Sequence, residues 1–282
     1  MSAAAKPAAG GGTPSDLIPL REHAAFAELV RRHAGIKLGE NKRQLLTTRL
    51  QKRMRSLGLT SFAAYRQYLE ANMADEIGEL INAITTNLTA FFRENHHFLY
   101  LRRYFDEVPP GARLRVWSAG CSTGEEPYSI AMVYLESSAP DRRVTLEITA
   151  TDIDSNCLRQ ADSGIYDRTA ARGLSEPRLV RHFLRGVGRN AGRIRVRPEP
   201  RALVRFHRHN LMNRWNVDEP FDLVFCRNVV IYFDDDVQKA VFRSFAEALA
   251  PEGLIFIGHS ENLLRVSEHF QSLGQTIYRS RA

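Results

Sequence analysis

The sequence has few cysteines and no long apolar run, and each of these features excludes some classes of protein. Its three cysteines, Cys121, Cys157 and Cys226, are widely separated and form no C-x-x-C pair. This argues against a disulfide framework or a zinc site and is typical of a reducing cytoplasm. No run approaches the roughly 18 apolar residues of a membrane span. Because the N-terminus also lacks the apolar core of a secretory signal, we expect a cytoplasmic protein.

Basic residues outnumber acidic residues, which favours partners that carry negative charge. The 282 residues include 39 Lys and Arg but only 32 Asp and Glu, a formal net charge of +7. A basic protein favours acidic partners: nucleic acid, anionic lipid or a carboxylate-rich protein surface. Hydrophobic residues make up 44% of the chain and charged residues 25%, values typical of a globular protein with a core. Composition does not choose among the three kinds of partner.

The chain divides into a tail, a helical part and an alternating part. Residues 1–15 are rich in Ala, Gly and Pro, which predicts a flexible tail. Residues 16–90 carry apolar residues at helical spacing and predict a small all-helical domain. Residues 91–112 predict a further helix and a linker that ends at a Pro-Pro-Gly breaker, and 113–282 form the second domain.

Strands alternate with helices after the linker. We predict strands at 113–119, 144–152, 221–228, 249–260 and 275–280, with helices between them. This order indicates an α/β fold with a doubly wound, mostly parallel sheet that is covered on both faces. Residues 183–208 interrupt the rhythm with glycines, arginines and short apolar pieces, and predict a small antiparallel insertion.

A glycine turn follows the first predicted strand. Gly120 and Gly124 lie between strand and helix, where a nucleoside-containing ligand fits. Glu125 and Glu126 then open the helix, and two carboxylates would repel a pyrophosphate. S-adenosylmethionine (SAM) carries an ammonium and a sulfonium but no phosphate, so it tolerates them. Two plainer interpretations stay open: a tight packing turn, and acids that only complement the helix dipole.

Polar residues also follow the next strands. Asp152 ends the second strand, and a carboxylate there can accept hydrogen bonds from both ribose hydroxyls. Its alternative role is a helix N-cap, although Asp154 is available for that task. Asn228 and Tyr232 follow the strand at 221–228 and could face the reacting centre. A turn-forming Asn and a half-buried Tyr are equally consistent with the spacing.

Five strings together resemble the chemotaxis protein methyltransferase family, CheR. They are TTNLTAFFRENHHF (85–98), VWSAGCSTGEEPYS (116–129), TDID with SGIY (163–166), FDLVFCRNVVIYF (221–233) and GHSEN (258–262). The resemblance implies a helical N-terminal domain and a SAM-dependent methyltransferase domain. It also implies methyl transfer to glutamates in the cytoplasmic helical bundle of chemoreceptors, with S-adenosylhomocysteine as product and a role in adaptation. Any membrane association would be indirect, through receptors.

The resemblance assigns site residues. Together with Gly120 of the turn, the implied cofactor contacts are Asn87, Thr89, Arg93, Glu126, Asp152, Asn210, Leu211, Arg227 and Asn228. Tyr232 matches a tyrosine beside the methyl group, and we expect Arg93 and Tyr232 to serve catalysis. Arg93 could align the incoming carboxylate, or it could form a structural ion pair with Glu94 or Asp106. A glutamate of pKa about 4.3 is already ionised, so no general base is needed.

Histidines and cysteines offer no metal site by sequence. His96 and His97 are adjacent and lie in one of the family-like strings, and we expect them to pack at the domain interface. A paired-histidine metal site would need further ligands, and we expect no metal.

Two basic segments suggest partners. Residues 37–55 hold seven Lys or Arg against one acid, and we expect Arg49 and Arg53 to dock onto an acidic receptor helix. A solvated helix face is the alternative, and nucleic acid is disfavoured because interleaved aromatics are absent.

In the insertion, the resemblance implies binding of a receptor C-terminal peptide by strand addition. The residues concerned are Gly186, Gly188, Arg185, Arg195 and Arg197. An ordinary basic hairpin is the alternative there.

Three functions compete at this point. The first is an active protein-glutamate methyltransferase, which we expect to be a monomer. The second is a non-catalytic SAM-sensing or receptor-docking module on the same fold. The third, a nicotinamide-dependent oxidoreductase, is disfavoured by the carboxylates beside the glycine turn.

Overall fold

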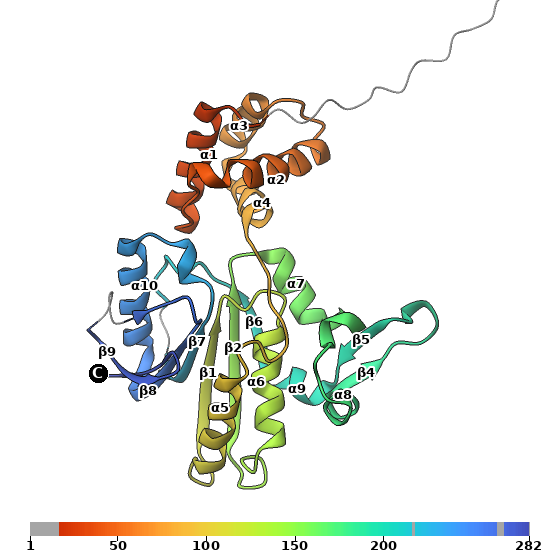
Figure 1. The fold of residues 1–282 in the computed structure, drawn as a ribbon, viewed down its shortest axis with the longest axis vertical. Coiled ribbons are helices and arrows are strands. Elements are labelled where there is room, and N and C mark those ends of the chain that lie inside the picture. The colour runs from red at the N-terminus through yellow and green to blue at the C-terminus, as the bar shows by residue number, and fades with distance from the viewer. Residues whose placement is uncertain (1–16, 216–217, 264–267, 282) are drawn as a thin grey trace, which may run out of the picture.

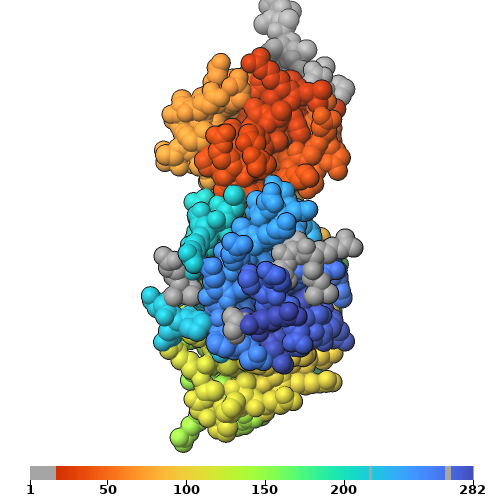
Figure 2. All heavy atoms as spheres, turned by 90° about the vertical axis from the view of Figure 1, so that its left-hand side faces the viewer, coloured from red at the N-terminus to blue at the C-terminus, as the bar shows by residue number. Residues whose placement is uncertain are grey.

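A helical domain stands on a larger sheet domain in the computed structural model (Figures 1 and 2). The structure describes residues 17–215, 218–263 and 268–281. The predicted tail, residues 1–15, lies outside the described residues. Within these ranges, no helix combines the length and apolar character that a membrane crossing needs.

The helical domain is built from amphipathic helices, as their spacing predicts. They are α1 (Leu20–Ala34), α2 (Arg43–Ser56), α3 (Phe62–Ala71) and α4 (Met73–Ile84). The predicted stripe on α2 is buried at Leu46, Leu50 and Met54, where it packs in one cluster with Phe26 and Tyr65. Burial of such a stripe, more than helix propensity, stabilises helices of this length.

The sheet domain has the predicted mostly parallel sheet. Its strands lie in the order β6-β2-β1-β7-β8-β10-β9; the pairings from β6 to β8 are parallel, and β10 pairs antiparallel with both β8 and β9. Their bounds are β1 (Arg113–Ala119), β2 (Thr145–Asp152), β6 (Val204–Arg208), β7 (Phe221–Cys226), β8 (Leu249–Ile257), β9 (Phe270–Gly274) and β10 (Ile277–Ser280). β9 escaped prediction because only its first residue is buried.

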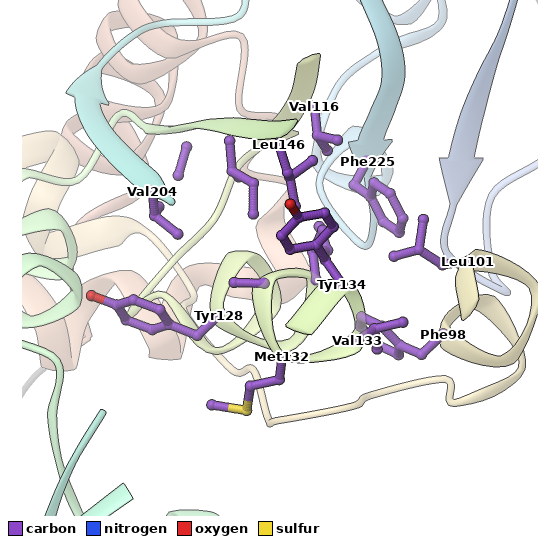
Figure 3. Packing of buried hydrophobic residues seen from close by; sticks show 14 of the residues in the cluster. Phe98, Leu101, Val116, Tyr128, Met132, Val133, Tyr134, Leu146, Val204 and Phe225 are labelled. Atoms are coloured by element: carbon purple, nitrogen blue, oxygen red, sulfur yellow. The ribbon is translucent and has the colours of Figure 1, made fainter. Parts of the chain in front are cut away.

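Helices cover both faces of this sheet. On one face, α5 (His96–Glu107), α6 (Glu125–Glu136) and α7 (Ser155–Ser163) share a core cluster that includes Val116, Leu146 and Phe225. Figure 3 shows this packing. On the other face, α10 (Asp235–Ala248) packs Phe245 against Trp117. Val116 and Trp117 point to opposite faces because side chains alternate along a strand.

The small sheet begins earlier in the chain than predicted, at Ile165, and ends earlier, at Val196. β3 (Ile165–Asp167), β4 (Phe183–Arg185) and β5 (Arg193–Val196) form a separate antiparallel sheet in the order β3-β5-β4. The predicted range 183–208 is therefore wrong at its end, since residues 204–208 form β6 of the main sheet. β6 is an edge strand with one buried residue, so its pattern does not differ from that of the insertion. Two short helices, α8 (Glu176–His182) and α9 (Pro198–Ala202), flank β4 and β5 in the chain.

Candidate active site

The carboxyl ends of β1, β2 and β7 meet where the order of connections reverses. From β1 the chain adds β2 and β6 on one side, and β7 and β8 lie on the other. Open α/β sheets bind ligands in the crevice outside such a point. A cavity of about 1140 Å³, counting space open to solvent, lies here, with Gly120, Asp152, Arg227 and Asn228 in its wall.

The sequence-based site residues gather in this one cavity. All of the predicted cofactor and catalytic residues line it, namely Asn87, Thr89, Arg93, Gly120, Glu126, Asp152, Asn210, Leu211, Arg227, Asn228 and Tyr232. They come from five separate segments of the chain, so the fold brings them together. Their individual roles remain predictions.

Asp152 presents a buried carboxylate to the cavity. Its oxygens accept hydrogen bonds from the backbone N–H of Ser122 at 2.7 Å and of Asp154 at 2.9 Å. Burial raises the pKa of this carboxyl, although the same N–H groups oppose the shift. Asp154 caps α7 through Asn156 and Cys157, so the N-cap alternative belongs to Asp154 and not to Asp152.

Glu126 and Arg227 form a buried ion-pair network. The guanidinium of Arg227 lies 3.2 Å from the Glu126 carboxylate and 3.3 Å from that of Glu94. Glu126 also accepts a hydrogen bond from Ser118 at 2.7 Å. Burial opposes the ionisation of Glu94, yet Arg227 holds its pKa below the ordinary value. Breaking a buried pair of this kind typically costs about 3–5 kcal/mol, so the side chains are held firmly in place.

Glu125 behaves differently from its neighbour. Its carboxylate accepts a hydrogen bond from Thr123 at 2.6 Å, and the residue does not line the cavity. Burial raises the pKa of this carboxyl. The plainer interpretation, an acid that complements the first turn of α6, therefore fits Glu125. Glu126 alone of the two faces the cavity.

The segment between α4 and α5 carries Asn87 and Arg93 past the cavity. Asn87 donates a hydrogen bond to the Asp154 carboxylate at 2.7 Å. Arg93 is half-buried and donates to the carbonyl of Leu88 at 2.8 Å. The alternative of an ion pair for Arg93 is not supported, since Glu94 pairs with Arg227 and Asp106 with Arg102. Within the described part of the chain, the other donors of the Arg93 guanidinium have no hydrogen-bond partner and are available to a ligand.

The loop after β7 and the helical domain close the cavity. The Tyr232 carbonyl accepts a hydrogen bond from the backbone N–H of Lys37 at 2.8 Å, and Ile36 pairs with Phe233 in a β-bridge. The Lys42 ammonium lies 5.3 Å from the centre of the Tyr232 ring. Asn210 donates to the carbonyl of His33 at 2.6 Å, which ties the loop after β6 to the end of α1.

Sequence reasoning missed the contribution of the helical domain to this cavity. Ala34, Ile36, Leu38, Lys42 and Leu45 all line it. Their local pattern describes only an amphipathic helical segment, because the surface that they meet lies more than a hundred residues away in the chain. From the sequence alone, Lys42 is one of the seven cations of the basic segment 37–55, and nothing distinguishes it from the others.

The residues present fit SAM in kind. Asp152 and Glu126 supply acceptors for hydroxyl and ammonium groups. The start of α6, where a pyrophosphate would bind, is taken by the carboxylates of Glu125 and Glu126. Lys42 and Arg93 in the same cavity supply cations for a carboxylate. The cavity can therefore hold a cationic nucleoside and an acidic side chain at once.

A cluster near the site brings together side chains of the kinds that ligate metals, but an arginine already lies beside its carboxylate. Glu94, His96 and His259 bring ligand atoms within 4.8 Å of one another. Arg227 already supplies positive charge beside Glu94, so we assign no metal to this cluster. His97 is fully buried and bonds to Gln275 and Thr276. The prediction that His96 and His97 pack at the domain interface is wrong. Both pack within the sheet domain, His97 against the turn between β9 and β10 and His96 against the rings of His97 and His259.

The predicted docking arginines have partners inside the molecule. Arg53 forms an ion pair with the buried Glu76 at 2.5 Å. Arg49 donates to the carbonyls of Ile84 and Thr85 and to the Thr86 hydroxyl, the last two at 2.6 and 3.1 Å. Their role as receptor contacts stays a prediction. The exposed cations of this stretch are Lys37, Lys52 and Arg55.

The predicted peptide-binding residues lie on the small sheet and its turn. A Cβ at Gly186 would lie 2.0 Å from the Asn190 carbonyl oxygen, so no side chain fits there. Gly188 has φ +57° and open space around it. Arg185 and Arg195 are exposed on β4 and β5, whereas Arg197 is half-buried and donates to the carbonyl of Val180. These residues lie outside the cavity.

Comparison with known proteins identifies the family. Residues 87–279 match the model of the CheR methyltransferase SAM binding domain, and residues 21–85 match that of the CheR methyltransferase all-alpha domain. The chain is 44% identical to the chemotaxis protein methyltransferase of Escherichia coli (strain K12) over 257 residues, 90% of this chain and 88% of the relative. It is 45% identical over 261 residues to that of Salmonella typhimurium, with the same shares covered.

A further relative extends the match to another genus. Chemotaxis protein methyltransferase 2 of Pseudomonas aeruginosa is 44% identical over 256 residues, 89% of this chain and 90% of the relative. The family-level expectations from the sequence, for fold and for SAM as cofactor, are thereby confirmed. The chain belongs to the CheR methyltransferase family, and it is a SAM-dependent methyltransferase.

Proposed function

We propose that the protein methylates glutamate side chains in the cytoplasmic helical bundle of chemoreceptors, forming γ-methyl esters in chemotactic adaptation. Relatives at 44–45% identity carry the name chemotaxis protein methyltransferase, which supports the pathway. One observation supports the acidic substrate. A single cavity holds two carboxylates, Glu126 and Asp152, together with the cations Lys42 and Arg93 beside Tyr232.

The chemistry asks little of the protein beyond positioning. When bound, SAM supplies an activated methyl group. A substrate glutamate is ionised at neutral pH, with a pKa of about 4.3, so no residue needs to remove a proton. Arg93 orients the incoming carboxylate through the planar donors of its guanidinium. Tyr232 fixes the reacting groups from the loop after β7, and the helical domain excludes water from the cavity.

Labelled SAM and receptor-containing membranes test this function. Membranes from cells that express a receptor but lack their own methyltransferase are incubated with the protein and with SAM labelled in the methyl group. Base-labile label on the receptor is the expected result, because γ-methyl esters hydrolyse in alkali. Membranes without receptor are the control. SAM binding without any label transfer would favour the non-catalytic docking module instead.

Receptor docking on the helical domain is part of the same proposal. The exposed cations Lys52 and Arg55 of α2 can meet the acidic stretches that surround substrate glutamates. Arg53, predicted for this contact, is 23% exposed and held by Glu76, so its guanidinium has fewer free donors for a partner. The encounter should weaken as salt rises, since exposed charges are screened.

We also propose that the small sheet binds a receptor C-terminal peptide by strand addition. β4 lies at an edge of that sheet; Leu184 on β4 is 41% exposed, and Val187 just after it is 79% exposed. Backbone groups of an edge strand can pair with an added strand, while arginines select an acidic residue or a terminal carboxylate. Such tethering would raise the local concentration of the enzyme near its substrates.

Substitution of Gly188 tests the peptide proposal. Gly188→Val should abolish binding of a labelled receptor-tail peptide, because valine is strained at φ +57°. SAM affinity should not change. Gly111→Val is the matched control, since Gly111 also has a left-handed φ and open space but lies outside the small sheet. If the wild type binds no tail from receptors of its own organism, the chain is a peptide-independent member of the family.

A further inference from the structure

A buried carboxylate holds the loop that follows β7. Glu261, 6% exposed, lies just beyond β8 and accepts four backbone hydrogen bonds. One oxygen accepts from Asn228 at 3.0 Å and from Gly258 at 2.6 Å. The other accepts from Val229 at 2.9 Å and from Val230 at 3.0 Å. Every partner is a donor, so the ionised form of Glu261 is the one that fits.

The backbone in this loop needs such support. Asn228 has φ +60°, a left-handed conformation that costs free energy for a residue other than glycine. Gly258 lies directly against it, and a Cβ there would be 2.4 Å from the Asn228 side-chain nitrogen. A strained conformation persists only where its surroundings fix it. Glu261 supplies that restraint through three successive N–H groups.

The far end of the loop is held from the helical domain. Lys37 donates its backbone N–H to the carbonyl of Tyr232 at 2.8 Å, and Ile36 bridges to Phe233. The two anchors therefore hold the two residues of this loop that are predicted to contact cofactor and substrate, Asn228 and Tyr232, and both line the cavity. Glu261 does not line the cavity, so any effect on the reaction passes through the loop.

We propose that Glu261 is a positioning residue for methyl transfer: by accepting the N–H groups of Asn228, Val229 and Val230, its carboxylate fixes the loop that places Asn228 and Tyr232 in the cavity. The inference rests on the proposed function, since it assigns roles in that reaction. It requires a charge and not merely a side chain of the right size. An amide in place of the carboxylate would turn an NH₂ group toward N–H donors that need acceptors.

Two variants separate charge from size. Glu261→Gln keeps the size and loses the charge, and Glu261→Asp keeps the charge on a shorter chain. We expect the Gln variant to lower kcat about 10- to 100-fold at saturating SAM. We expect the Asp variant to recover part of that loss. Glu199→Gln, at an exposed acid with no ion-pair partner among the described residues, is the matched control and should keep the wild-type kcat.

Hydrogen exchange supplies a readout that does not depend on activity. In the wild type, the amides of residues 228–230 should exchange slowly, because Glu261 accepts all three. In Glu261→Gln they should exchange faster, while exchange in β1 and β2 stays unchanged. That pattern also shows that the variant is folded. If the Gln variant does not fold, the wild-type exchange rates and the Asp variant decide.

The outcomes separate this inference from the proposed function. A kcat within twofold of wild type in Glu261→Gln, or rapid exchange of residues 228–230 in the wild type, would overturn the positioning role. A wild type that labels no receptor would overturn the proposed function, and the exchange experiment would still show whether Glu261 holds the loop.

Discussion

The two sides of the cavity are built in different ways. On the sheet side, Asp152, Glu126 and Arg227 are buried, and each has at least two fixed partners. On the helical side, the wall is mostly apolar, and it includes Ile36 and Leu38 together with the cation Lys42. The polar groups of the sheet side are fixed by their partners, whereas the helical side covers the cavity with apolar side chains. The difference leads us to expect that ligand binding depends mainly on the sheet side and enclosure mainly on the helical side.

Backbone and side-chain contacts join the two sides. Lys37 meets Tyr232, Asn210 meets His33, and Arg49 meets the start of the segment that joins the domains. The segment between α4 and α5 runs from the helical domain down to the sheet domain (Figure 1). If the helical domain serves mainly to enclose the cavity, substitutions on the sheet side should lower SAM affinity most. Substitutions at the contacts between the two sides should lower SAM affinity and the rate of methyl transfer less strongly.

The largest effect is expected at Asp152 on the sheet side. Asp152→Ala removes acceptors for the ribose and leaves the N–H groups of Ser122 and Asp154 unpaired. We expect a loss of about 3 kcal/mol in SAM binding, roughly 150-fold, measured by calorimetry. Asp141→Ala, at an exposed acid that does not line the cavity, is the control. An unchanged affinity in Asp152→Ala would refute the ribose assignment.

Arg93 should separate rate from affinity. Arg93→Ala should slow single turnover about 100-fold at saturating SAM, because the substrate carboxylate loses its orienting group. Affinity for S-adenosylhomocysteine should fall much less. Tyr232→Phe should act in the same direction, and Arg103→Ala, on the exposed face of α5, should not. Wild-type turnover in both site variants would return Arg93 and Tyr232 to a structural role.

His97, behind the sheet side, should make stability depend on pH. Burial and the nearby Arg227 lower the pKa of His97 to about 3. The unfolded chain takes up a proton below about pH 6.5 and the folded chain does not, so stability falls as pH drops through that value. Between pH 7 and pH 5 this group should cost about 2 kcal/mol.

Urea unfolding at the two pH values measures this term. The fall in stability should be smaller in His97→Gln than in the wild type by about that amount, while the exposed His207→Gln should behave as the wild type. An equal fall in all three proteins would contradict the buried neutral state of His97. For the same reason, we expect no loss of activity near pH 7 that traces to His97.

The sequence predicted the sheet side of the site better than the helical side. Asp152, Arg227 and Asn228 could be placed because each ends or follows a strand, and strand ends of a parallel sheet share one edge. Lys42 and Ile36 could not, since nothing in their own segment records which distant surface they meet. The same applies to Glu261: its place in GHSEN was visible, but its backbone partners lie about 30 residues away.

Prediction of the fold also succeeded where burial leaves a pattern in the sequence and failed where it does not. Strands with apolar cores, such as β1 and β7, were found close to their true bounds, because burial on both faces leaves a strong pattern. β9 and β6 lie at the two edges of the sheet, where a single buried residue gives little signal. The local pattern around Arg49 and Arg53 does not indicate their contacts with Thr85 and Glu76, because only tertiary packing brings these residues together.

The smallest effect, and the sharpest test of the comparison, is expected at Arg49. Its guanidinium holds the carbonyl of Thr85 at 2.6 Å and the hydroxyl of Thr86 at 3.1 Å, directly before Asn87 in the cavity wall. Arg49→Ala should therefore weaken binding of S-adenosylhomocysteine to the isolated protein about tenfold, or about 1.4 kcal/mol. A pure receptor contact could not change that affinity, because no receptor is present.

Arg55→Ala, on the exposed side of the same helix, is the matched variant. It should leave this affinity unchanged but raise the KM for receptor, most strongly at low salt. The reverse pattern, an unchanged affinity in Arg49→Ala with a raised KM for receptor, would make Arg49 a docking residue and would leave closure to the backbone contacts alone.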